Sequence, residues 1–164
     1  MTQTTAADLL PWNDPDDLLQ SLYRVEKAPR PELRDALARL LEHDDPDVRG
    51  EALRILVTRW KDHAFRGNAA QTLRFDPDPE VRAAAAFALA SVSADGDRLE
   101  DTQLLLEMLH DEAQEATVRG AAYDALLVLY RKPEFPTKKR DFDASLDVDW
   151  AWVKALEASL RRIE

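Results

Sequence analysis

Residues 45–52 read Asp-Pro-Asp-Val-Arg-Gly-Glu-Ala, and this stretch decides the fold because the chain repeats it. The second copy is residues 78–85, Asp-Pro-Glu-Val-Arg-Ala-Ala-Ala, and the third is residues 115–122, Glu-Ala-Thr-Val-Arg-Gly-Ala-Ala. The copies align without gaps, and their valines stand 33 residues (81 − 48) and 37 residues (118 − 81) apart. Self-similarity at a period of roughly 20–50 residues predicts a repeat architecture.

Each copy predicts the start of a helix. Asp45 and Asp78 can accept hydrogen bonds from the free N–H groups of a first helical turn, and Pro46 and Pro79 suit the first helical position, where no N–H is needed. The third copy, which begins with Glu115, is a weaker start. Apolar side chains then recur at helical spacing. The predicted core rows are Val48, Ala52, Ile55 and Leu56; Val81, Ala85, Ala88 and Leu89; and Val118, Ala122, Ala125 and Leu126.

Partner helices are expected between these, over residues 31–43, 62–74 and 99–110, so that the repeating unit is helix, turn, helix. A capped start at residues 13–15 predicts one more helix before them, and the apolar face of residues 147–163 predicts a closing helix after them. No segment shows the alternation of a strand. The sequence therefore predicts an all-α fold of about eight helices with no sheet.

Length and composition fit one domain over residues 1–164, since 45% of the residues are hydrophobic and 33% are charged. Within it we expect N-terminal capping helices (1–30), three helix-turn-helix repeats (31–131), a long loop (132–146) and a C-terminal capping helix (147–164). The chain has no cysteine, which excludes disulfides, thiolate metal sites and a thiol nucleophile and agrees with a reducing cytosol. With no secretion signal and no apolar run of roughly 18 residues, we expect a cytoplasmic protein that is not inserted in a membrane.

The net charge is −10, from 32 acidic and 22 basic side chains. Such a charge repels phosphate backbones and anionic membranes, so nucleic acid is not expected as a partner. A basic protein surface would be attracted. The alternative reading is that an acidic surface only keeps the protein soluble.

Residues 41–130 resemble the HEAT-like repeat family of bacteria, the group that includes phycobilin-lyase-type repeats, whose second helix opens with Asp-Pro-x-Val-Arg followed by alanines. Residues 45–52 and 78–85 match that opening well. The Thr-Pro-Leu-His and Trp-Leu-Gly-Tyr signatures of ankyrin and tetratricopeptide repeats are absent. The resemblance implies a short right-handed α–α superhelix. It leaves the activity open, because such repeats occur in adaptors, enzyme subunits, chaperone-like lyases and inhibitors.

The repeated arginines, Arg49, Arg82 and Arg119, could form an anion-binding ladder. An arginine at a helix start between stacked repeats more often ties its own loop to an acidic residue of a neighbouring repeat, for which Asp45 and Asp78 are candidates. We favour this structural role, because the three arginines share one register.

The acidic clusters and the three histidines give no site for a metal, a cofactor or catalysis. The clusters at residues 14–17, 44–47 and 76–80 lack the glycine and closing glutamate of a calcium loop, and they stand where helix caps belong. His43, His63 and His110 have no second ligand at metal-binding spacing. Phosphate-binding and nucleophile-turn motifs are also absent, so the sequence favours a protein that is not an enzyme.

The outward face of the second helices is the predicted binding surface, and the resemblance implies that it lines the concave side of the solenoid. The alignment sets three rows side by side on it: Gly50, Ala83 and Gly120; Arg54, Phe87 and Asp124; and Val57, Ala90 and Leu127. Phe87 is an aromatic side chain among small neighbours, as expected of a binding anchor. Its alternative role is to pack into the adjacent repeat.

The segment 132–143 is a second candidate surface. It is long for a connection, and it places Lys138, Lys139 and Arg140 between Phe135 and Phe142 in an otherwise acidic protein. It is either a plain linker across an acidic groove or an arm that contacts the partner.

These features predict a non-catalytic protein-binding module, monomeric when unbound, whose partner has a basic surface. An immunity protein or antitoxin and an adaptor subunit both fit this description. From another class, the resemblance allows a bilin lyase-like enzyme subunit or chaperone. A DNA-cradling repair glycosylase, known among HEAT-like folds, is opposed by the charge of −10.

Overall fold

The chain forms a row of helices in a computed structural model that describes residues 14–25, 30–93, 98–132 and 142–162. The α-helices are α1 (Pro15–Val25), α2 (Arg34–Leu40), α3 (Pro46–Leu53), α4 (Arg66–Phe75), α5 (Pro79–Val92), α6 (Arg98–His110), α7 (Ala116–Leu129), α8 (Ala144–Asp147) and α9 (Trp150–Leu160). The 3-10 turns η2 (Pro31–Leu33) and η4 (His63–Phe65) precede α2 and α4, and the π-helical turn η3 (Arg54–Arg59) continues α3. No strand occurs in the described ranges, which confirms the all-α prediction.

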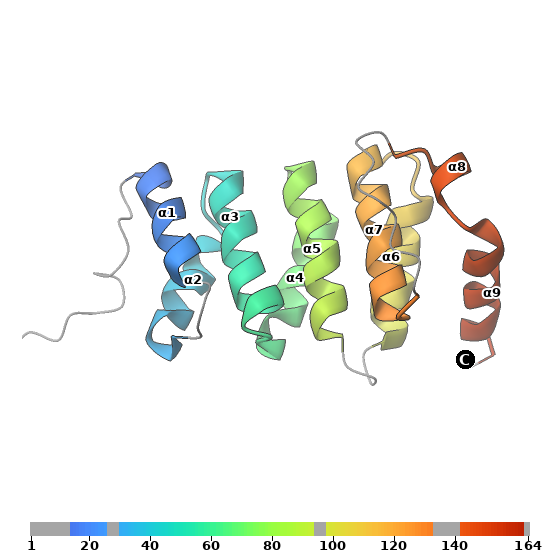
Figure 1. The fold of residues 1–164 in the computed structure, drawn as a ribbon, viewed down its shortest axis with the longest axis horizontal. Coiled ribbons are helices and arrows are strands. Elements are labelled where there is room, and N and C mark those ends of the chain that lie inside the picture. The colour runs from blue at the N-terminus through green and yellow to red at the C-terminus, as the bar shows by residue number, and fades with distance from the viewer. Residues whose placement is uncertain (1–13, 26–29, 94–97, 133–141, 163–164) are drawn as a thin grey trace, which may run out of the picture.

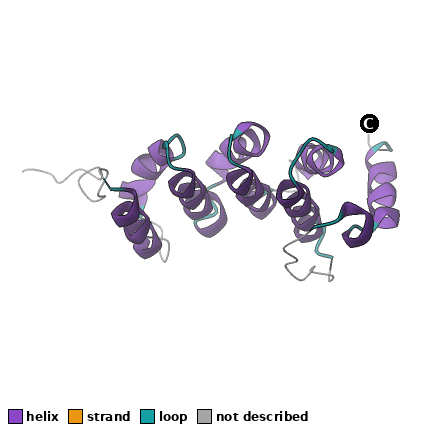
Figure 2. Cartoon of the chain, turned by 90° about the horizontal axis from the view of Figure 1, so that it is seen from above, coloured by secondary structure: helices purple, strands orange, loops and turns teal. Residues whose placement is uncertain are grey.

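The helices stack in two layers. Figure 1 shows α1, α3, α5 and α7 side by side in one layer, with α2, α4 and α6 behind them, and Figure 2 shows the same two layers from above. Helix α5 packs against α3 and α7 within its layer and against α4 in the other layer. The expected helix-turn-helix repeats are therefore present and stacked in chain order, as in a solenoid.

The predicted helix starts are confirmed by their hydrogen bonds. The Asp45 carboxylate accepts from the backbone N–H of Asp47 at 2.9 Å, and the Asp78 carboxylate accepts from that of Glu80 at 2.8 Å. Asp14 caps α1 in the same way. Glu115 accepts no capping hydrogen bond from α7, which agrees with the weaker start predicted for the third copy.

The core lies between the two layers. Every residue of the predicted core rows is buried, and all of them except Val81 belong to one continuous hydrophobic cluster. Val48, Val81 and Val118 are at most 3% exposed, and each begins a row of buried alanine and larger aliphatic side chains. Small side chains let neighbouring helices approach closely while the larger ones fill the space between layers.

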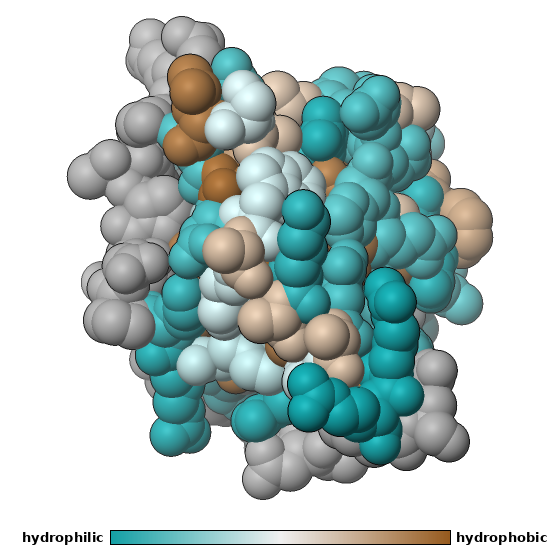
Figure 3. All heavy atoms as spheres, turned by 90° about the vertical axis from the view of Figure 1, so that its right-hand side faces the viewer, coloured by the Kyte–Doolittle hydropathy of each residue, from teal (hydrophilic) through white to brown (hydrophobic). Residues whose placement is uncertain are grey.

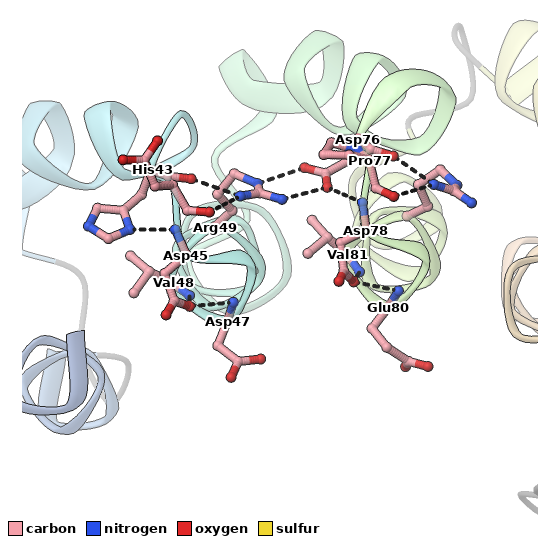
Figure 4. Close-up of polar contacts among 12 residues, drawn as sticks. His43, Asp45, Asp47, Val48, Arg49, Asp76, Pro77, Asp78, Glu80 and Val81 are labelled. Atoms are coloured by element: carbon pink, nitrogen blue, oxygen red, sulfur yellow. Dashed lines mark hydrogen bonds and ion pairs between the residues drawn. The ribbon is translucent and has the colours of Figure 1, made fainter.

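The repeated arginines hold the loops together, although their acidic partners differ from those expected. Arg49 donates to the backbone carbonyls of His43 and Asp44 and binds both carboxylate oxygens of Asp76, at 2.8 and 2.9 Å (Figure 4). Arg82 likewise binds the carbonyls of residues 76 and 77 and pairs with Glu115 in the next repeat. Asp45 and Asp78 are unsuitable as partners because their carboxylates already cap α3 and α5.

A second set of arginine contacts joins the other layer. Arg34 donates to Asp62 at 2.6 Å, and Arg66 donates to both carboxylate oxygens of Asp101, at 2.7 and 3.1 Å. Asp101 is 2% exposed, so its charge needs this pairing. Each repeat is thus tied to the next by a bidentate or nearly bidentate ion pair.

The C-terminal end differs from the single closing helix that the sequence predicts, since Val148 and Asp149 separate α8 from α9. Val148, Leu156 and Leu160 are buried as expected, and Trp152 packs edge-on against Tyr123 and Tyr130. Figure 3 shows this end of the molecule, with pale and light-brown residues in a band between hydrophilic ones.

Trp150 is partly buried at the start of α9. The start of α9 at Asp149 turns Trp150 towards the preceding repeat, where its ring lies 5.3 Å from that of His110 and its Nε1–H donates to the carbonyl of Ala144 at 2.7 Å.

Candidate functional site

The outward side of the layer of α1, α3, α5 and α7, which we call the open face, carries the candidate site. Arg54, Phe87 and Asp124 occupy the same position in three consecutive repeats. Each stands six residues after the valine of its Val-Arg pair, which is Val48, Val81 or Val118. None of the three belongs to the fully buried core. Adjacent packed helices lie about 8–10 Å apart, so this central row crosses the open face at right angles to the helices.

Tyr23 on α1 extends the central row, although the Val-Arg register does not reach this helix. Its ring is 56% exposed, and its hydroxyl is close enough to Arg54 to influence the pKa of that guanidinium. Helix α1 lacks the Val-Arg pair that set the register of the other helices. The capping motif could have set it, because aligning Pro15 with Pro46 places Tyr23 at the position of Arg54.

Val57 and Leu127 do not belong to the open face. Their side chains are 0% and 1% exposed, and the aligned Ala90 is 8% exposed, so the predicted third row is part of the core. The residues that flank the central row each follow the predicted third row by one position. They are Thr58, Ser91 and Val128, and all three are partly exposed. A helix in the middle of a layer touches neighbours on both flanks and the second layer behind, which widens its buried arc beyond one narrow stripe.

Phe87 is the main apolar feature at the centre of the open face. Its side chain is 36% exposed, while its helical neighbours Ala83 and Ala90 are small and buried. In the described part of the chain the other large hydrophobic side chains that are exposed are Tyr23, Phe75 and Leu146. Phe75 ends α4 in the opposite layer and Leu146 lies on α8, so Tyr23 and Phe87 are the aromatic pair on this face.

Arg54 lies between the two aromatic side chains and is paired with Glu51. Its guanidinium donates two hydrogen bonds to the Glu51 carboxylate, at 2.6 and 2.8 Å. Burial raises the pKa of Glu51 to about 7, and the positive charge of Arg59 opposes this shift. Burial likewise lowers the pKa of Arg54. Glu51 and Arg54 thus form an ion pair on this part of the open face, and the positive charge of Arg59 is near enough to act on both.

Asp124 is different, because burial raises the pKa of its carboxyl to about 6 and no described side chain compensates. Its carboxylate receives no hydrogen bond and makes no ion pair with any described residue. A partly buried carboxylate without a donor is unfavourable in the free protein.

Phe142 closes the open face at its C-terminal end. Its ring lies over Gly120 of α7, where an added Cβ atom would be 3.1 Å from the ring. Phe142 is therefore a packing residue against α7, and the glycine makes room for it. The other predicted residues of this segment, Phe135, Lys138, Lys139 and Arg140, lie outside the described residues.

Two of the three histidines, His43 and His110, have structural contacts. His43 Nδ1 accepts from the backbone N–H of Asp45, and His110 Nε2 lies 2.7 Å from the Glu157 carboxylate. No group of three potential ligands is arranged for a metal ion among the described residues. In the same residues no helix has the length and apolar character that a membrane crossing requires.

Comparison with known proteins identifies a repeat family. A family model of HEAT repeats matches residues 33–127. No curated protein and no solved structure matches the chain. The match covers more than half of the sequence, including all three Val-Arg helix starts and the central row on α3, α5 and α7. The chain therefore belongs to the HEAT-repeat family.

Proposed function

We propose that this protein is a non-catalytic binding module that holds another protein on its open face, with Phe87 as the anchor. HEAT repeats generally mediate protein–protein interactions. The proposal rests on the exposed Phe87, which lies in the central row of the open face. Tyr23 and Arg54 belong to the same row. Tyr, Phe and Arg side chains surrounded by small residues are enriched in the centres of protein interfaces.

The charge of the chain supports a partner with a basic surface. A net charge of −10 accelerates the encounter with a basic protein and slows the encounter with an acidic one. An immunity protein or antitoxin that covers a basic toxin would use such a surface, as would an adaptor subunit.

The test compares two variants that remove the same side chain from opposite layers. Phe87→Ala removes the proposed anchor, and Phe75→Ala removes a phenylalanine that is 77% exposed on α4. Tagged wild type and both variants are used to capture proteins from the native cell, and bound proteins are quantified by mass spectrometry. Circular dichroism of each purified variant establishes that it is folded.

We expect the recovery of the principal partner to fall at least about ten-fold with Phe87→Ala, since interface anchors contribute roughly 2 kcal/mol or more to binding. Recovery with Phe75→Ala should equal that of wild type. Equal recovery with both variants, or loss with Phe75→Ala alone, would contradict the proposed face.

A further inference from the structure

We infer that Asp124 is the receptor for a basic side chain of the partner, so that the open face recognises a protein segment with an arginine or lysine beside an apolar residue. This inference rests on the proposed function and specifies the chemistry of the partner.

The chain pairs its other buried acids with arginine. Glu51 binds Arg54, Asp76 binds Arg49, and Asp101 binds Arg66. Asp62, which is partly buried, binds Arg34. In each case the guanidinium satisfies a carboxylate that has lost water.

Asp124 breaks this pattern. The remaining partly buried acids of the described residues are helix caps or have another partner, as Asp45, Asp78 and Asp111 do at helix or turn starts and Glu157 does with His110. Asp124 lies in the middle of α7, where no backbone N–H is free to be capped. Among the described residues, Asp124 is therefore the one partly buried acid whose carboxylate has no partner that is also described.

The position of Asp124 also suits a partner that binds Phe87. Asp124 stands next to Phe87 in the central row, one helix spacing away, or about 8–10 Å. A cation from the partner would supply the positive charge that Asp124 lacks beside it, and an apolar side chain from the same segment would pack on Phe87. An unpaired carboxylate that is costly in the free protein and neutralised on binding favours association, because the partner relieves the cost.

This spacing restricts the partner segment. In a helix, residues seven apart are about 10 Å apart along the axis and lie on one face. In a polyproline II segment, residues three apart are about 9 Å apart along the axis and also lie on one face. The basic and apolar residues of the partner are accordingly expected at one of these two separations.

Selection from a random peptide library tests the inference. Peptides about 16 residues long can place the two side chains two helical turns apart, and they are selected separately on wild type, on Asp124→Asn and on Glu42→Gln. Glu42 is an exposed acid between α2 and α3, so Glu42→Gln removes the same charge away from the open face. Binding of synthesised winners to all three proteins and to Phe87→Ala is then measured by calorimetry.

We expect peptides selected on wild type to carry arginine or lysine at a fixed separation from an apolar residue, and to bind Asp124→Asn at least about ten-fold more weakly. Their affinity for Glu42→Gln should remain within about two-fold of wild type. Peptides that need Phe87 but bind wild type and Asp124→Asn equally would overturn the inference and leave the proposed function standing. Peptides that bind without need of Phe87 would contradict the proposed function, and this inference with it.

Discussion

The partly buried carboxylate of Asp124 opposes folding of the free protein. Burial raises its pKa to about 6, whereas an aspartate in the unfolded chain titrates near about 3.9. Between these values the folded protein keeps a proton that the unfolded chain has lost. The free energy of unfolding therefore falls as the pH rises through this window, and the cost persists above it.

Asp124→Asn should for this reason stabilise the free protein. We expect the free energy of unfolding at pH 7.5 to rise by roughly 1–3 kcal/mol, and the difference from wild type to disappear near pH 4, where the folded wild type is protonated at this site. Urea unfolding at both pH values measures it, with Glu42→Gln as the control for loss of a negative charge. A loss of stability at pH 7.5 would mean that Asp124 has a stabilising partner.

At this scale the sequence indicated the central row but misjudged its neighbours. The shared register identified Arg54, Phe87 and Asp124, and the structure brings them onto one face. Val57 and Leu127 were assigned to that face and are buried. Adjacent helical positions differ by about 100°, so the boundary between outward and core rows depends on how many neighbours a helix touches, which helical periodicity alone does not reveal.

At the scale of elements, two glycines at the same repeat position have different surroundings. An added Cβ atom at Gly50 would have Val81 as its nearest neighbour at 3.8 Å, which is an ordinary contact. At Gly120 it would be 3.1 Å from the ring of Phe142. The repeat position is thus open on α3 and occupied on α7.

Alanine substitutions should separate these two environments. Gly50→Ala is expected to raise the free energy of unfolding by about 0.5–1 kcal/mol, because alanine favours helix over glycine. Gly120→Ala should give a smaller gain or a loss, since Phe142 must shift. Urea unfolding of both variants measures this, and Phe142→Ala combined with Gly120→Ala should recover the helix-propensity gain relative to Phe142→Ala alone. An equal gain at both glycines would show that Phe142 does not depend on Gly120.

Other features of the elements could not be read from the sequence. The six-residue π-helical turn η3 begins at Arg54. The stretch from Pro46 to Arg59 is as long as the stretch from Pro79 to Val92, which is a regular α-helix. The sequence therefore contains no inserted residue that would predict the turn. The break between α8 and α9 depends on Asp149, whose carboxylate caps α9 by accepting from Trp152 N–H at 3.0 Å. Its sequence context equally allowed one continuous helix.

At the scale of the whole molecule, stability depends on contacts between neighbouring repeats. Arg49 makes the clearest of these contacts. Its guanidinium donates four hydrogen bonds that join two loops. The Arg49 side chain is 11% exposed and that of Asp76 is 8% exposed. Burial works to raise the pKa of Asp76, but the hydrogen bonds from Arg49 hold it below its usual value.

Arg49→Ala should therefore be strongly destabilising, by about 3–5 kcal/mol, because it leaves a buried carboxylate unpaired. Arg74→Ala is the matched control, since Arg74 and Glu107 are an exposed pair at 3.5 Å worth at most about 0.5–1 kcal/mol. Thermal or urea unfolding compares the two. Similar small effects would show that the Val-Arg motif does not hold the stack together.

The overall architecture was the most predictable property of the chain. Repeat spacing, capped helix starts and alanine-rich rows all favour the same stacked helices, so local and long-range signals agree. The partner is a different matter, because the outward residues are not constrained by folding, and Phe87 or Asp124 can be interpreted only once the surrounding faces are known.

The central claim is that the open face, and not the opposite layer, contacts the partner. A photo-crosslinking amino acid placed at position 87, and in a parallel sample at position 75, tests it in the native cell. Both positions are exposed phenylalanines on opposite layers. Illumination should link position 87 to one discrete partner protein and leave position 75 without that adduct. The same adduct from position 75, with none from position 87, would contradict the account.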